Sequence, residues 1–174
     1  MKILRKTLLA SLLALPLVSF AAPEVEVGFS PEGSAHQLVL KTIEGARHSI
    51  RMMAYAFSAP DIVQALGDAT RRGVEVRVVV DKKRNADKAG QRAIRDATAQ
   101  GVALRTNDRY TLHHDKVIIV DDDTVETGSF NFAPSAERSN SENVVVLRGL
   151  PEITRQYVAH WQSRWDAGEP WASR

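Results

Sequence analysis

The sequence contains no cysteine, so disulfide bonds, thiol nucleophiles and cysteine-ligated zinc are excluded. It also lacks a marked excess of charge of either sign, because 23 lysines and arginines stand against 21 aspartates and glutamates. This balance does not indicate a protein that binds nucleic acid through a uniformly basic surface. Any affinity for phosphate has to come from a local basic patch. The 174 residues are enough for one domain with a proper hydrophobic core.

Long apolar runs are absent as well, with one exception at the start of the chain. Residues 8–20 form a mostly apolar run behind a basic segment, and Ser19 and Ala21 place small residues before a cleavage point. The alternative is an uncleaved membrane anchor. That alternative is disfavoured because the run is too short to span a bilayer comfortably and contains Pro16.

We therefore expect residues 1–21 to be a cleaved secretory signal peptide and residues 22–174 to be the mature domain. The protein is then exported and is either periplasmic or secreted. Cleavage removes three of the 23 basic residues and leaves 20 against 21 acidic residues, so the mature chain is close to neutral.

The first part of the mature chain alternates between strand and helix patterns. Four segments have the alternation or the apolar composition of strands: residues 24–29, 50–57, 74–80 and 102–105. Amphipathic helix patterns fill the three intervals between them. Ser34 and Ser58 each open a capping-box pattern, with Gln37 and Asp61 three residues later, and we expect them to begin the first two helices.

The rest of the chain departs from this alternation. Residues 113–120 and 124–129 have strand patterns on either side of a triple-aspartate turn, which indicates a β-hairpin. A polar loop over residues 133–140, a strand over residues 143–147 and a final helix from Pro151 complete the order. The fold class is therefore α/β, with a single-domain mixed β-sheet flanked by helices.

The hairpin carries the residues that point to chemistry. They are His114, Lys116 and Asp121, spaced H-x-K-x4-D, and a Gly-Ser-x-Asn segment that contains Ser129 and Asn131. Side chains two apart on a strand share a face, so His114 and Lys116 point the same way, and the turn brings the second strand beside them. A nucleophile or base, a fixed cation and two neutral hydrogen-bonding groups suit a phosphate group that becomes a charged transition state.

This spacing resembles the signature of the phospholipase D superfamily, and the window around it is most similar to the small bacterial endonuclease branch. The resemblance implies a phospholipase D/nuclease-like sandwich with one H-x-K-x4-D motif per chain. It also implies that His114 attacks phosphorus to form a covalent phosphohistidine, while Lys116, Ser129 and Asn131 bind the phosphate. Glu142 stands where the pattern has an acidic residue that holds the histidine ring.

Asp121 and its two acidic neighbours allow two interpretations. The distance from His114 puts Asp121 at the turn and on the opposite face, so we expect structural support from it. The alternative is a metal site that combines residues 121–123 with His113 or His114, since hard cations bind clustered carboxylates. The turn explains the acidic residues without a ligand shell, and Lys116 would repel a cation. We expect no metal and no other cofactor.

The mechanism that this resemblance implies needs two H-x-K histidines, and the chain has one. Four other histidines occur, and none has a lysine two residues later: His36, His48, His113 and His160. We therefore predict a symmetric homodimer in which two His114 side chains face each other across the two-fold axis. One would act as the nucleophile and the other as the general acid.

A basic cluster supplies candidate substrate contacts. Lys82, Lys83 and Arg84 follow the third strand, and Arg109 lies closer to the motif. They either follow a nucleic-acid backbone toward the site or form an ordinary solvated surface.

The sequence thus predicts an exported, metal-independent phosphodiesterase, with a DNA endonuclease of little sequence preference as the leading interpretation. The alternative is a phospholipase D that hydrolyses phospholipid head groups with the same site. The mature chain shows no amphipathic membrane-surface helix, although Trp161 and Trp165 in the last helix keep that alternative open.

Overall fold

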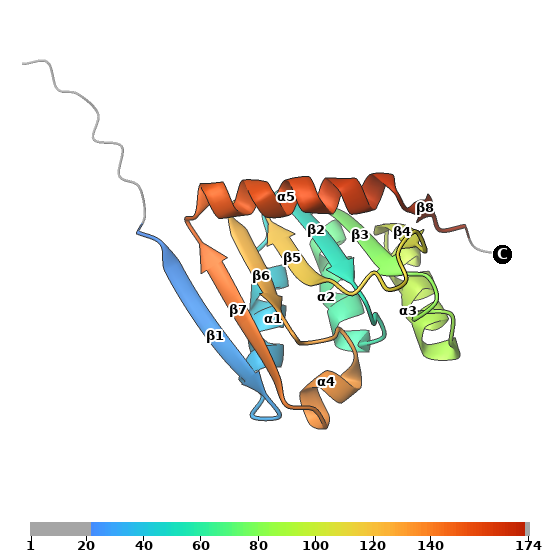
Figure 1. Ribbon diagram of the computed structural model, residues 1–174, viewed down its shortest axis with the longest axis horizontal. Helices are drawn as coiled ribbons and strands as arrows, with labels where there is room; N and C mark the ends of the chain where they lie inside the picture. Colours follow the sequence, from blue (N-terminus) through green and yellow to red (C-terminus); the bar gives the residue numbers. More distant parts are fainter. Residues whose placement is uncertain (1–21, 173–174) are drawn as a thin grey trace, which may run out of the picture.

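A computed structural model describes residues 22–172 as one mixed β-sheet with helices on both faces (Figure 1). The strands lie in the order β1-β7-β6-β5-β2-β3-β4-β8. Their bounds are β1 (Glu24–Ser30), β2 (Ser49–Ala54), β3 (Glu75–Asp81), β4 (Ala103–Asn107), β5 (Lys116–Val120), β6 (Thr124–Gly128), β7 (Glu142–Arg148) and β8 (Glu169–Pro170). Strands β2, β3 and β4 pair in parallel, and the other neighbouring pairs are antiparallel. The prediction of a single mixed sheet flanked by helices is confirmed.

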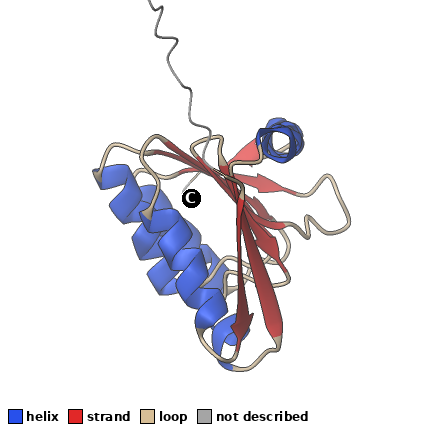
Figure 2. Ribbon diagram, turned by 90° about the vertical axis from the view of Figure 1, so that its left-hand side faces the viewer, coloured by secondary structure: helices blue, strands red, loops and turns tan. Residues whose placement is uncertain are grey.

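The helices cover the two faces of the sheet unequally (Figure 2). Their bounds are α1 (Ser34–Glu44), α2 (Pro60–Arg71), α3 (Lys88–Ala99), α4 (Pro134–Arg138) and α5 (Pro151–Asp166). Helices α1, α2 and α3 pack on one face, as crossover connections between parallel strands require. Helix α5 lies alone across the other face, near one end of the sheet (Figures 1 and 2).

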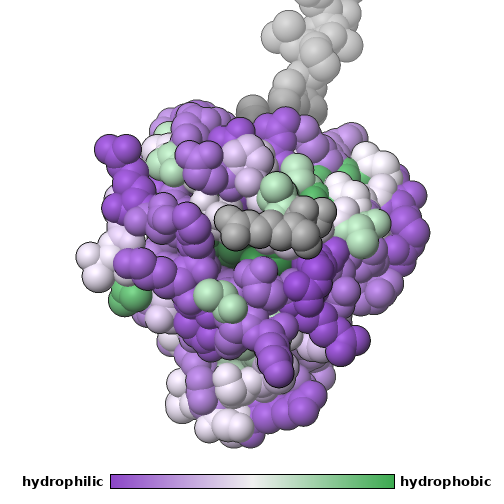
Figure 3. Space-filling view, turned by 90° about the vertical axis from the view of Figure 1, so that its right-hand side faces the viewer, coloured by the Kyte–Doolittle hydropathy of each residue, from purple (hydrophilic) through white to green (hydrophobic). Residues whose placement is uncertain are grey.

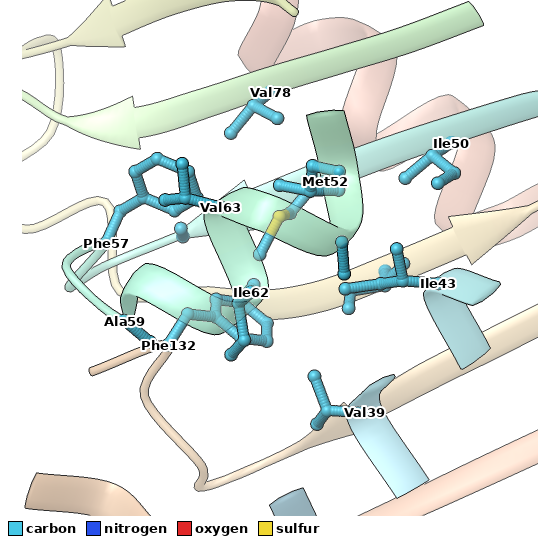
Figure 4. Packing of buried hydrophobic residues seen from close by; sticks show 14 of the residues in the cluster. Val39, Ile43, Ile50, Met52, Phe57, Ala59, Ile62, Val63, Val78 and Phe132 are labelled. Carbon is cyan, nitrogen blue, oxygen red and sulfur yellow. The ribbon is translucent and has the colours of Figure 1, made fainter. Parts of the chain in front are cut away.

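Two apolar clusters hold these layers together. Met52 and Phe57 pack with Ile62 of α2 and with Phe132 on the side of the three helices (Figure 4). On the opposite side the buried indole of Trp161 anchors α5, and its ring N–H donates to the Met52 carbonyl oxygen at 3.2 Å. Alternation along the strands sends side chains to both clusters, so the central strands are buried on both faces.

The arrangement of strands brings several loops to one edge of the sheet. Ala54, at the end of β2, pairs with Lys116 at the start of β5. The carboxyl ends of the parallel strands β2, β3 and β4 therefore lie beside the beginning of β5. In α/β sheets this edge is where ligands bind.

Three local predictions were wrong. The hairpin strand begins at Lys116 rather than at residue 113, and the expected polar loop contains the short helix α4. The two capping boxes do not form, because Gly33 and Ala59 hold the N-cap positions of α1 and α2. The Ser34 hydroxyl instead bonds the backbone of Phe29, 2.8 Å from its nitrogen and 3.1 Å from its oxygen.

The predicted signal peptide, residues 1–21, lies outside the described residues. Within residues 22–172, no helix combines the length and the apolar character needed to cross a membrane.

Candidate active site

His114 and Lys116 are in direct contact at the start of β5. The Lys116 ammonium nitrogen lies 3.1 Å from Nδ1 and 3.3 Å from Nε2 of His114, and it donates to the His114 carbonyl oxygen at 2.8 Å. The imidazole is exposed, whereas Lys116 is only 7% exposed. The two groups meet as expected, but His114 belongs to the extended segment before β5, so the pleat of a strand does not explain their contact.

Tyr55 forms the floor under both groups. Its ring lies 4.4 Å from the His114 ring between centroids, and the Lys116 ammonium lies 5.1 Å from the Tyr55 centroid. The Tyr55 backbone N–H also donates to the Asp115 carbonyl oxygen at 2.9 Å. The contact between the Lys116 ammonium and the Tyr55 ring is a cation–π interaction, which holds the ammonium group without neutralising it. This role was not predictable from the sequence, because Tyr55 belongs to the mostly apolar segment of residues 50–57.

The charge of Lys116 is set by opposing effects. Burial lowers the pKa of the Lys116 ammonium, and the carboxylates of Asp115 and Glu142 partly oppose that shift. The result is a poorly hydrated cation beside an exposed imidazole. Such a cation can stabilise negative charge on a neighbouring phosphate more strongly than a solvated lysine can.

Ser129 and Glu142 are paired with each other. The Ser129 hydroxyl donates to Glu142 Oε2 at 2.5 Å, and it accepts a bond of 3.0 Å from the Asn143 backbone N–H. The other carboxylate oxygen of Glu142 accepts from the Asn140 side chain at 2.8 Å. Glu142 therefore orders the polypeptide after β6 and contributes charge near Lys116, and it makes no hydrogen bond to the His114 ring within the described chain.

Asn131 follows on the same segment, between two buried aromatic rings. Phe130 and Phe132 are 1% and 0% exposed and belong to the core, so they do not stack on a substrate. They fix the backbone on either side of Asn131. Its side-chain oxygen is buried and has no hydrogen-bond partner among residues 22–172, an unusual state for a buried polar atom.

Asp121 lies at the far end of β5 from His114 and acts on another connection. Its carboxylate accepts from the backbone N–H groups of Arg47, His48 and Ser49 at 2.8–2.9 Å. Burial opposes ionisation of this carboxyl, but the bonds from Ser49, Arg47 and His48 outweigh it and lower the pKa of Asp121. Asp121 therefore supports the loop between α1 and β2. This position also separates it from both histidines of the alternative metal site.

Asp81, at the end of β3, binds the backbone of the segment that carries His114. The Asp81 carboxylate accepts from the His113 backbone N–H at 2.8 Å and from the Arg84 backbone N–H at 2.6 Å. The His113 side chain is buried, and burial lowers the pKa of its imidazole despite the nearby Asp115 and Asp81 carboxylates. His113 is therefore a neutral structural residue, and the loop after β3 fixes the backbone beside the catalytic candidate.

The basic cluster does not reach this site. Lys82 pairs with Asp108 at 2.6 Å, Arg84 lies 3.4 Å from Asp87, and neither Lys83 nor Arg109 lines the cavity at His114. Lys82, Lys83 and Arg84 are exposed and close to α3, on a side of the molecule that is mostly hydrophilic (Figure 3). The interpretation as a solvated surface therefore agrees better with these contacts than a direct role beside His114 does.

The cavity itself has a wall that the sequence did not reveal. It measures about 540 Å³ and lies between the hairpin and α5. The motif contributes His114, Lys116, Thr127 and Gly128. Three α5 residues complete the wall: Gln156, Tyr157 and His160. The apolar pattern around Trp161 identified the face of α5 that packs on the sheet. That the turn of α5 before Trp161 faces the site is evident only from the way α5 crosses β5.

Known proteins share this fold. A family model described as a cardiolipin synthase, phospholipase D-like domain, matches residues 39–165. The chain belongs to the phospholipase D family. The chain is therefore a phosphodiester hydrolase of this family, and the contact between His114 and Lys116 is its candidate active site.

Individual family members differ in name. The phospholipase D of Rickettsia bellii is 33% identical over 141 residues, which cover 81% of this chain and 69% of that protein. The mitochondrial cardiolipin hydrolase of Xenopus laevis is 31% identical over 137 residues, which cover 79% of this chain and 64% of that protein.

Solved structures agree with the family assignment. The crystal structure of the phospholipase D family member Nuc from Salmonella typhimurium is 50% identical, with a TM-score of 0.86 over 87% of this chain and 100% of that chain. NucT from Helicobacter pylori is 20% identical with a TM-score of 0.72, a similarity of fold.

Proposed function

We propose that this phospholipase D family member is a metal-independent endonuclease that hydrolyses DNA phosphodiester bonds with little sequence preference. The observation that carries the proposal is the exposed His114 imidazole within 3.1–3.3 Å of a buried ammonium group, in a cavity that both residues line. Lys116 supplies the positive charge that a metal ion would otherwise bring to the phosphate. Recognition centred on phosphate carries no sequence information, which fits non-specific cleavage.

The reaction then proceeds in two displacements. A His114 ring nitrogen attacks phosphorus, a P–N bond forms, and the P–O bond to the departing sugar oxygen breaks while that oxygen takes a proton from an acid. A water molecule then loses a proton to the group that acted as the acid and attacks phosphorus, and the P–N bond to His114 breaks. Lys116 and the Asn131 amide offset charge on the non-bridging oxygens in both steps.

A second copy of the chain is the source we propose for the acid, through its own His114. Helix α5 covers only part of its face of the sheet (Figure 2). Three apolar residues of the edge strand β1 are exposed: Val25 at 58%, Val27 at 62% and Phe29 at 52%. Val27 pairs with Val145, which pairs with Thr127 in the wall of the active site. An exposed apolar stripe that continues into an incomplete site favours association with an identical chain.

Phospholipid is the competing substrate, because relatives of this chain carry the names phospholipase D and cardiolipin hydrolase. The two tryptophans that kept this alternative open serve the fold. Trp161 is fully buried, and Trp165 stacks on it at 5.2 Å and lies 4.6 Å from the Arg105 guanidinium. Neither ring is presented for insertion into a lipid surface, which favours the polynucleotide.

We further propose that the enzyme acts outside the cytoplasm, on the basis of the signal-peptide pattern in residues 1–21.

The experiment that tests the function offers plasmid DNA, RNA and phosphatidylcholine vesicles in parallel to purified residues 22–174, with and without a strong chelator. We expect DNA cleavage that survives the chelator, is lost in His114→Ala and is retained in His48→Ala, an exposed histidine at the other end of the sheet. Head-group release without DNA cleavage would replace the nuclease with the phospholipase. Equal activity in the parent and in His114→Ala would contradict both.

A further inference from the structure

His160 of α5 faces the active site and is held there by Asp115. Its Nε2 lies 3.2 Å from Asp115 Oδ1, while the other oxygen of that carboxylate lies 3.6 Å from Nδ1 of the buried His113. Asp115, directly before Lys116 in the chain, is therefore hydrogen-bonded to His160 and lies close to the buried His113 without a hydrogen bond to it. His160 stays 37% exposed and lines the same cavity as His114.

The contact with Asp115 leaves the other ring nitrogen available. Nδ1 of His160 makes no hydrogen bond to another residue of the described chain. Gln156 lies one turn earlier on the same face of α5 and also lines the cavity. The Asp115 carboxylate accepts from Nε2–H, so the free Nδ1 is an acceptor in the neutral ring and a donor in the imidazolium form. In the imidazolium form helix α5 presents two donors, this ring and the Gln156 amide, opposite the phosphate-binding groups of the hairpin.

The hydrolytic steps proposed above do not use these groups. In those steps Lys116 and Asn131 offset charge on the scissile phosphate, and the Asp115 carboxylate is already hydrogen-bonded to His160. Donors beside a phosphate site that the reaction does not need fit a second anionic group of the substrate. A polynucleotide carries one phosphate per nucleotide, whereas phosphatidylcholine presents a single phosphodiester in its head-group linkage.

We propose that His160, oriented by Asp115, binds a phosphate next to the scissile one and so makes the site selective for polynucleotides over substrates with one phosphodiester. This inference rests on the proposed function and adds the substrate class to it. His160 is a substrate-binding residue in this account, and Asp115 is a positioning residue. A direct contact to the reacting atoms is not part of their role.

The test compares a dinucleoside monophosphate, which has one phosphodiester, with a longer oligonucleotide of the same bases. In His160→Ala we expect KM for the oligonucleotide to rise about tenfold, the loss of roughly one hydrogen bond to a charged group, with kcat within about twofold. Both constants for the dinucleoside monophosphate should stay at the values of the parent. His160→Asn, whose amide nitrogen lies near the place of Nδ1, should recover part of the affinity.

Controls separate binding from folding and from catalysis. Asp115→Asn should raise KM for the oligonucleotide less than His160→Ala does, and His48→Ala should leave it unchanged. Equal losses on both substrates would show a structural or catalytic role, and an unchanged KM would show no contact; either result overturns the inference. If the parent cleaves neither substrate, the proposed function fails instead. If the parent is active and His114→Ala is inactive, the proposed function stands, and the result with His160→Ala alone decides the inference.

Discussion

The hydroxyl group of Ser129 donates a 2.5 Å hydrogen bond to the carboxylate of Glu142. These residues lie 13 positions apart and meet because β6 and β7 are antiparallel neighbours. The pair also brings a negative charge near Lys116, where it favours the protonated ammonium. Glu142 thus acts on the site through Ser129 and Lys116.

Replacing Glu142 with Gln keeps its shape and removes its charge. We expect kcat to fall about 10- to 100-fold, since a charge-assisted hydrogen bond contributes about 1.5–3 kcal/mol and the charge that supports Lys116 is lost. Steady-state kinetics at neutral pH measures this, with circular dichroism to show an intact fold. Glu152→Gln, at an exposed carboxylate of α5, is the matched control, and equal kcat in both variants would remove Glu142 from the active site.

The proposed dimer makes a quantitative prediction for mixed subunits. If each active site needs two His114 side chains, random exchange between equal amounts of parent and His114→Ala subunits leaves about a quarter of the activity of an all-parent sample. Independent subunits would leave about half. Co-expression with two affinity tags, followed by activity measurement on the total pool and on the mixed species, distinguishes the two. Val27→Lys should give monomers of low activity.

Asp121 should control stability and leave the chemistry unchanged. Its three backbone bonds lower the pKa of the carboxyl, so its contribution is present above the ordinary pKa of 3.8 and is lost as pH falls through the folded value. In Asp121→Asn we expect the free energy of unfolding at neutral pH to drop by on the order of 2 kcal/mol. Urea unfolding from pH 7 to pH 3 measures this. Asp123→Asn is the control, and a profile for Asp121→Asn that matches it would contradict the role.

Glu126 is the opposite case. Burial raises the pKa of this fully buried carboxyl to about 8, from an ordinary value of 4.5, and neither oxygen has a hydrogen-bond partner within residues 22–172. The folded state keeps a proton that the unfolded state releases, so stability falls as pH rises from about 4.5 to about 8. Relative to the parent, Glu126→Gln should gain up to ~1.4 kcal/mol of unfolding free energy per pH unit across that range. Parallel pH profiles for the two proteins would show that Glu126 does not titrate in this way.

The fold was predictable to a large extent because hydrophobic periodicity records burial. The alternating pattern over residues 24–29 and the apolar pattern over residues 74–80 correspond to β1 and β3. Local contacts were less predictable. Ser34 looked like a helix cap, but Gly33, with φ of 89°, already ends the turn, and the Ser34 hydroxyl bonds the neighbouring backbone.

The residues of the candidate active site were likewise only partly predictable from the sequence. His114 and Lys116 could be found because their spacing is local and specific. Tyr55, Asp81 and His160 could not, since each reaches the site from a different part of the chain and only the pairing of β2 with β5 and the crossing of α5 bring them together. The start of β5 at Lys116 was missed for a related reason: the tertiary bond from His113 to Asp81 replaces a strand ladder there.

The central claim is that His114 becomes covalently bonded to phosphorus during turnover. Base-quenched reactions of the parent with a phosphodiester, digested and analysed by mass spectrometry without exposure to acid, which hydrolyses the P–N bond, test it most directly. We predict a phosphorylated or nucleotidylated peptide that contains His114, formed within the first turnover and absent from His114→Asn. Turnover by the parent without any such adduct, together with activity in His114→Asn, would contradict the account.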